Sequence, residues 1–133
     1  MTLTLTKSDT ITHRIRVQTE SFYVPERSDP RNLLYFFAYR IRITNEGADP
    51  VQLISRHWII TDGHGQVEEV RGAGVVGEQP RLAPGETFEY TSACPLHTRF
   101  GTMQGTYHMI RDNRVAFEAE IGQFNLLHPA VLN

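Results

Sequence analysis

The sequence contains a single cysteine, Cys94, and a single lysine, Lys7. One thiol cannot form an internal disulfide, which is typical of a protein kept in a reducing compartment. We therefore expect a cytoplasmic protein. The formal net charge is −2 at pH 7, so no nucleic-acid surface is expected.

Long hydrophobic runs are also missing. The longest, LLYFFAY at residues 33–39, is far shorter than the roughly 20 residues of a membrane-spanning helix. The N-terminal MTLTLTKSDTITHRI lacks the basic segment and apolar run of a secretory signal. We expect no membrane insertion. A length of 133 residues predicts one domain, residues 1–133, which can form a core without a disulfide or a metal.

Alternation of apolar and polar residues runs through the chain and predicts strands rather than helices. Residues 11–24 read as one continuous strand, with Ile11 on its apolar face. Residues 33–45 read as another, with Leu33 inside, and Val115 is expected to face inward near the end. The seven expected strands cover residues 11–24, 33–45, 51–61, 66–71, 87–94, 103–112 and 114–124.

The turn signals between these strands predict an all-β, immunoglobulin-like antiparallel β-sandwich of about seven strands. The apolar tail at residues 126–132 is expected to cover the sheet or to contact a second subunit, so a homodimer is an alternative. The residues expected in the core are Phe37, Tyr39, Ile41, Trp58, Ile60, Phe88, Tyr90, Phe117 and Ile121.

Three glycines, Gly72, Gly74 and Gly77, have the G-x-G-x-x-G spacing of dinucleotide-binding proteins. That motif requires a helix after the glycines, because the helix N-terminus holds the pyrophosphate. Pro80 and Pro84 exclude such a helix. The glycines are therefore interpreted as shaping a surface loop, and the alternative is a nest of backbone amides that binds a nucleotide, a pyrophosphate or another anion.

The rest of this loop favours contact with another protein. Arg71 and Arg81 flank it and form a positive rim that suits a carboxylate or a phosphate. Val75 and Val76 lie between them in a polar surround, where apolar side chains suit a partner better than solvent. The prediction is a partner-binding loop from Arg71 to Arg81.

Candidates for metal binding and catalysis are few. His57, Asp62 and His64 surround a predicted turn and form the only candidate metal site, although their spacing matches no zinc motif. Cys94 lies three residues before His97 but shares the phase of the apolar Tyr90, which predicts a core cysteine rather than a nucleophile. We therefore expect a non-enzymatic binding module without a cofactor. The alternative is a protein that binds a nucleotide, a pyrophosphate or a divalent cation through the glycine-rich loop.

A long ordered stretch carries a family resemblance. Residues 56–107, RHWIITDGHGQVEEVRGAGVVGEQPRLAPGETFEYTSACPLHTRFGTMQGTY, resemble the ApaG family of small bacterial proteins, and YFFAYRIRITNEG and FNL extend the match. The resemblance implies a single ApaG domain with a fibronectin-type-III-like sandwich. It also implies a link to cobalt resistance and magnesium efflux, protein binding as the role, no catalytic residue, and a suggested nucleotide site at Gly72, Gly74 and Gly77.

Overall fold

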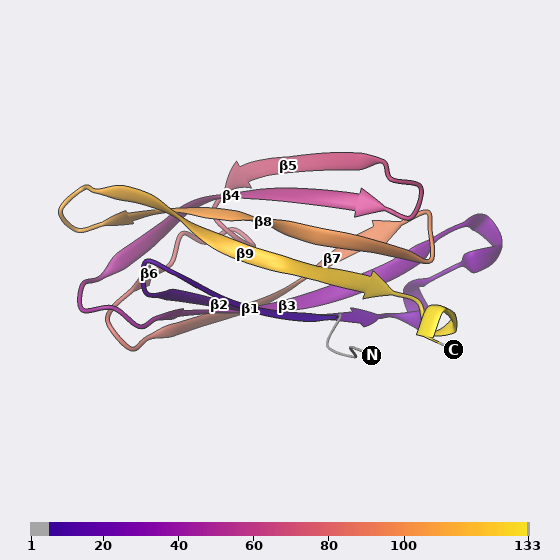
Figure 1. The fold of residues 1–133 in the computed structure, drawn as a ribbon, viewed down its shortest axis with the longest axis horizontal. Coiled ribbons are helices and arrows are strands. Elements are labelled where there is room, and N and C mark those ends of the chain that lie inside the picture. Colours follow the sequence, from indigo (N-terminus) through magenta and orange to yellow (C-terminus); the bar gives the residue numbers. More distant parts are fainter. Residues whose placement is uncertain (1–5, 133) are drawn as a thin grey trace.

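The computed structural model describes residues 6–132 and consists of strands joined by turns (Figure 1). Short 3-10 turns occur at Pro25–Arg27, Pro30–Asn32 and Pro129–Leu132. The strands are β1 (Lys7–Thr12), β2 (Ile15–Tyr23), β3 (Tyr35–Asn45), β4 (Val51–Asp62), β5 (Val67–Ala73), β6 (Arg81–Leu82), β7 (Thr87–Leu96), β8 (Phe100–Arg111) and β9 (Ala116–Leu127).

Two antiparallel sheets pack face to face and confirm the predicted sandwich (Figure 1). One sheet has the order β1-β2-β3-β7. The other has the order β5-β4-β8-β9, and β6 also pairs with β4. Strand β9 contacts β1 and β2 along one side of the sandwich. The alternating burial along each strand follows from the alternating apolar residues, because successive side chains point to opposite faces.

The expected strand at residues 11–24 is in fact a hairpin. Its two-residue turn, His13 and Arg14, has φ angles of 48° and 66°, as a tight hairpin turn requires. Such turns usually contain glycine or asparagine, so the sequence carries no turn signal here. The hairpin pairs Ile11 with Arg16 on the outward face of the sheet, so Ile11 is 56% exposed and does not lie in the core. Together with the two-residue β6, this hairpin adds two strands to the expected seven.

Two further expectations about inward-facing residues are wrong. Leu33 precedes β3 in a left-handed conformation with φ 56°, and its side chain is 58% exposed. Val115 lies in the turn between β8 and β9 and is 53% exposed. In both cases the strand begins later than the apolar pattern suggests, so the first apolar residue is left outside the ladder.

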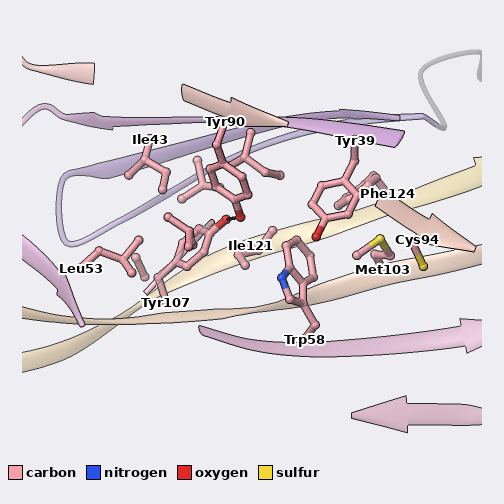
Figure 2. Packing of buried hydrophobic residues seen from close by; sticks show 14 of the residues in the cluster. Tyr39, Ile43, Leu53, Trp58, Tyr90, Cys94, Met103, Tyr107, Ile121 and Phe124 are labelled. Carbon is pink, nitrogen blue, oxygen red and sulfur yellow. Dashed lines mark hydrogen bonds between the residues drawn. The ribbon is translucent and has the colours of Figure 1, made fainter. Parts of the chain in front are cut away.

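The core lies between the sheets (Figure 2). Of the nine expected core residues, six are buried, and Ile60, Phe88 and Phe117 are partly buried against the core. The ring of Phe117 packs against His13 and lies under the Arg111 guanidinium, 4.5 Å from the ring centroid. Phe117 therefore closes one margin of the core instead of filling its centre.

Two tyrosine hydroxyls meet inside this core. The hydroxyl oxygens of Tyr90 and Tyr107 lie 2.5 Å apart, which joins β7 of one sheet to β8 of the other (Figure 2). Burial raises the pKa of both phenols, that of Tyr107 most strongly, because desolvation disfavours the phenolate. Cys94 is 5% exposed and belongs to the core, as predicted, and this burial raises the pKa of its thiol to about 12.

These shifts predict a loss of stability at alkaline pH. The folded chain keeps protons that the unfolded chain releases above the ordinary pKa values of 9.0 for cysteine and 10.0 for tyrosine. The stabilisation is complete below these values and is lost as the pH rises through them towards the folded pKa values. Urea unfolding at about pH 8 and about pH 11 should give a lower midpoint at the higher pH. Cys94→Ala should reduce the difference, and equal midpoints would contradict the prediction.

The C-terminal segment covers the protein's own sandwich. Leu126 is buried in β9, and the following His128 packs edge-on against the rings of Tyr23 and Tyr35, with centroids 4.5 and 5.7 Å away. The amide of His128 donates to the carbonyl oxygen of Arg99. This supports the first of the two alternatives for the tail. In the part of the chain that the structure describes, no helix has the length and apolar character needed to cross a membrane.

Candidate functional site

The glycine loop, residues 74–80, leaves the sheet between β5 and β6. Both strands pair with β4 along the edge that β8 does not occupy. The amide of Gly74 donates to the Ile54 carbonyl oxygen, and the amide of Leu53 donates to the Pro80 carbonyl oxygen. The loop is therefore held to β4 at both of its ends.

A two-residue turn forms the tip of the loop. The amides of Val75 and Glu78 each donate to the other residue's carbonyl oxygen, over 2.8 and 2.9 Å. Between them Val76 and Gly77 both have positive φ angles, 42° and 82°. Gly74 also has a positive φ, 62°, and a Cβ there would overlap the Glu78 carbonyl oxygen. The close backbone approach at Gly74 thus requires glycine.

Gly72 has a different role, which involves Arg56. Its backbone is regular strand, but a Cβ at this position would lie 2.9 Å from the Arg56 guanidinium nitrogens. The missing side chain lets Arg56 pass beneath β5 and donate to the carbonyl oxygens of Ala73 and Gly74 over 3.0 and 2.9 Å. Arg56 was not predicted as part of the site, although it shares the phase of the buried Trp58, which points it towards the inner face.

The structure corrects the prediction for one of the two valines. Val75 is 1% exposed and belongs to the core, so it anchors the loop and does not face a partner. Val76 is 54% exposed at the tip. A two-residue turn sends neighbouring side chains in different directions, and the apolar composition of the loop could not distinguish the anchor from the tip.

The geometry opposes the amide-nest alternative. A nest needs successive amides that point at one anion. The amides of Gly74, Val75 and Glu78 already donate to backbone carbonyl oxygens within the protein. Binding a pyrophosphate with these groups would therefore require the loop to give up its attachment to β4 and its own turn.

The two arginines of the predicted positive rim lie apart. Arg71 pairs in register with His57 of β4, whereas Arg81 pairs with Gln52. Five residues of strand correspond to roughly 15 Å. Arg71 lies 3.4 Å from a Glu69 carboxylate oxygen, and Arg81 donates to Asp112 over 2.6 Å. The arginines therefore form two separate ion pairs and not one anion site.

The candidate metal ligands are not brought together either. His57 and Asp62 are five residues apart on β4, which places their side chains on opposite faces of the strand. Nε2 of His57 lies 2.7 Å from Glu69, and Oδ1 of Asp62 accepts the amides of His64 and Gln66 in the β4–β5 turn. Among residues 6–132, no three His, Cys, Asp or Glu side chains are grouped to hold a metal ion.

The fold and the loop together define an antiparallel β-sandwich of the immunoglobulin and fibronectin type III kind, with a glycine loop hydrogen-bonded to one sheet edge. Residues 25–111 match the ApaG domain family. The chain is 62% identical over 111 residues to Protein ApaG of Bordetella pertussis, covering 84% of this chain and 85% of that one. It is 56% identical over 126 residues to Protein ApaG of Dechloromonas aromatica, covering 95% and 99%. The chain belongs to the ApaG family.

Solved structures agree with this assignment. A crystal structure of a Bordetella pertussis protein superposes with a TM-score of 0.85 at 60% identity, covering 86% of this chain and 94% of that one. The C-terminal domain of wzt, at 9% identity and a TM-score of 0.54, shares the fold alone.

Proposed function

We propose that the protein is a non-enzymatic module that binds another protein through the tip of the glycine loop. The observation that carries this proposal is Val76, an exposed β-branched residue with φ 42°. Positive φ is a genuine outlier for such a residue, and backbone strain of this kind concentrates at ligand and partner contacts. The buried Val75 and the Arg56 hydrogen bonds hold the tip in place, so a partner would meet it without ordering a flexible loop.

The same proposal accommodates the link to cobalt resistance and magnesium efflux that the ApaG resemblance implies. We propose that the protein acts on ion balance by binding a protein partner, in the cytoplasm, and not by holding the ion. The separation of His57 from Asp62 and the use of Asp62 in its own turn support this choice. Calorimetric titration with Co²⁺ and Mg²⁺ should then give no saturable heat, and a stoichiometric binding curve would contradict it.

The loop proposal predicts a selective effect of Val76→Ser. A photo-crosslinking amino acid at position 78, where the side chain is exposed beside the tip and φ is not positive, should label one protein reproducibly when the chain is expressed in its native cell. Val76→Ser should reduce that labelling about tenfold, because the loss of one well-buried apolar contact costs about 1–2 kcal/mol. Quantitative mass spectrometry of the crosslinked product measures the change.

Val67 provides the matched control. It is a valine of similar exposure, 60%, at the opposite end of β5. Val67→Ser should leave the labelling unchanged, and both variants should melt at the temperature of the parent. Equal loss in the two variants, or no loss in either, would refute the role of the loop tip.

A further inference from the structure

We infer a second docking site, at the far end of β5 from the glycine loop, for an acidic peptide segment that presents one large apolar side chain. It goes beyond the proposed function because it lies on different elements. The loop before β3, the β4–β5 turn, the β7–β8 turn and the C-terminal 3-10 turn lie at this end of the sandwich (Figure 1). Between them is a hollow of about 510 Å³, called here the end pocket.

Apolar side chains form the body of the end pocket. Leu33, Phe100 and Val131 line it together with Tyr35. Leu33 is 58% exposed, Phe100 45% and Val131 41%, so these three large apolar residues face solvent around one hollow. A cluster of exposed apolar side chains bounded by polar groups is typical of a protein contact, whereas single exposed apolar residues need no explanation.

Leu33 shows that the exposure is built into the fold. Its left-handed backbone, φ 56° and ψ 40°, follows the 3-10 turn Pro30–Asn32, and its amide donates to the Pro30 carbonyl oxygen. Nδ1 of His97 lies 3.2 Å from the Leu33 carbonyl oxygen. Leucine is disfavoured in this conformation, and glycine would adopt it without strain. The strained backbone thus places an apolar side chain at the rim of the pocket.

The floor of the pocket is preformed. The Gly63 amide donates to the Thr98 hydroxyl over 2.8 Å, and that hydroxyl donates to the Phe100 carbonyl oxygen over 2.7 Å. Thr98 is buried, and a Cβ on Gly63 would lie 3.1 Å from both Thr98 and the Phe100 ring. These contacts join the β4–β5 turn to the β7–β8 turn, so a ligand meets a pocket that is already shaped.

The charge around the pocket selects the partner. Its polar lining consists of Arg99, His64 and His97 with Thr98, and no carboxylate of the described residues belongs to it. The guanidinium of Arg99 is permanently charged and suits a carboxylate. An apolar side chain between acidic residues matches both parts of the pocket, since it fills the hollow while a neighbouring carboxylate meets the Arg99 guanidinium.

The experiment uses the full-length ¹⁵N-labelled chain and a capped heptapeptide with a central leucine flanked on each side by three acidic residues. Saturable amide shifts at Gly63, Arg99 and Phe100 at millimolar peptide are expected, and they should weaken with added salt. A peptide with serine in place of leucine should bind about tenfold more weakly, and one with lysines in place of the acidic residues should not bind. Equal binding of these peptides, or saturable shifts elsewhere alone, would overturn the inference.

Leu33→Gly is the decisive variant, because it removes the apolar side chain and relieves the left-handed backbone, so the fold is retained. It should raise the peptide Kd about tenfold, while Val76→Ser leaves that Kd unchanged. This comparison separates failure of the end pocket from failure of the loop proposal. Self-association of the free chain that Leu33→Gly abolishes, measured by sedimentation, would instead assign the pocket to a second copy and overturn the peptide assignment.

Discussion

Replacement of Phe37 by alanine is expected to lower the free energy of unfolding by about 3–5 kcal/mol. Phe37 is completely buried in the middle strand pair of one sheet, with Tyr23 and Cys94 as its register partners. Its ring packs edge-on against Tyr23, with 5.5 Å between centroids. Removing it takes away a large buried surface and leaves a cavity that the surrounding rigid strands cannot close. Urea unfolding followed by tryptophan fluorescence measures the loss.

Phe117→Ala is the matched control for this prediction. The sequence pattern places Phe117 in the core together with Phe37. In the structure, however, Phe117 lies at the margin of the core beside Arg111. We expect a smaller loss of about 1–2 kcal/mol, because the site is partly open to water and collapses more easily. A loss at Phe117 as large as that at Phe37 would show that the margin is buried in solution.

Gly74→Ala is expected to destabilise the protein by at least about 3 kcal/mol and to disrupt the glycine loop. The new Cβ would overlap the Glu78 carbonyl oxygen, which accepts the Val75 amide in the loop turn. To relieve the overlap, the turn must open and withdraw Val75 from the core. Hydrogen exchange of the Val75 amide should become markedly faster, and the urea midpoint should fall.

Gly77→Ala separates backbone strain from this overlap. Gly77 has a positive φ of 82°, as Gly74 also has a positive φ, but a Cβ on Gly77 would meet no atom within 4 Å. The expected cost is the left-handed conformation alone, about 1–2 kcal/mol. If the two alanine variants lost the same free energy of unfolding, the overlap between a Cβ at position 74 and the Glu78 carbonyl oxygen would not contribute to the loss at Gly74.

The position of the loop relative to the sheet explains why its glycines resemble a nucleotide motif without forming one. In a dinucleotide site the glycines lead into a helix whose free amides face the phosphate. Here Gly72 makes room for Arg56, Gly74 permits a close backbone contact, and Gly77 completes a turn. The loop shares the glycine spacing of a dinucleotide site, but each of its glycines is required for a different steric reason.

Local patterns were sufficient for the class of fold. The alternation along residues 35–45 and 116–124 predicts strands with one buried face, and Pro80 and Pro84 exclude a helix after the glycines. The first conclusion depends on strand geometry, in which side chains alternate between the two faces every two residues. The second depends on the proline ring, which removes the backbone N–H that a helix needs. Such constraints act within a few residues and can be read without knowing what packs above or below.

Only the tertiary structure decided which individual side chains form the sites. The His13–Arg14 turn is imposed by pairing of β1 with β2 and carries no glycine signal. Val75 and Val76 are identical in chemistry, yet one enters the core and the other faces solvent. Leu33 belongs to an apolar run but lies outside the ladder. The sequence determined an antiparallel sandwich because the alternation of apolar and polar residues is local. The buried anchor of the glycine loop, its exposed tip and the end pocket depend instead on contacts between segments far apart in the chain.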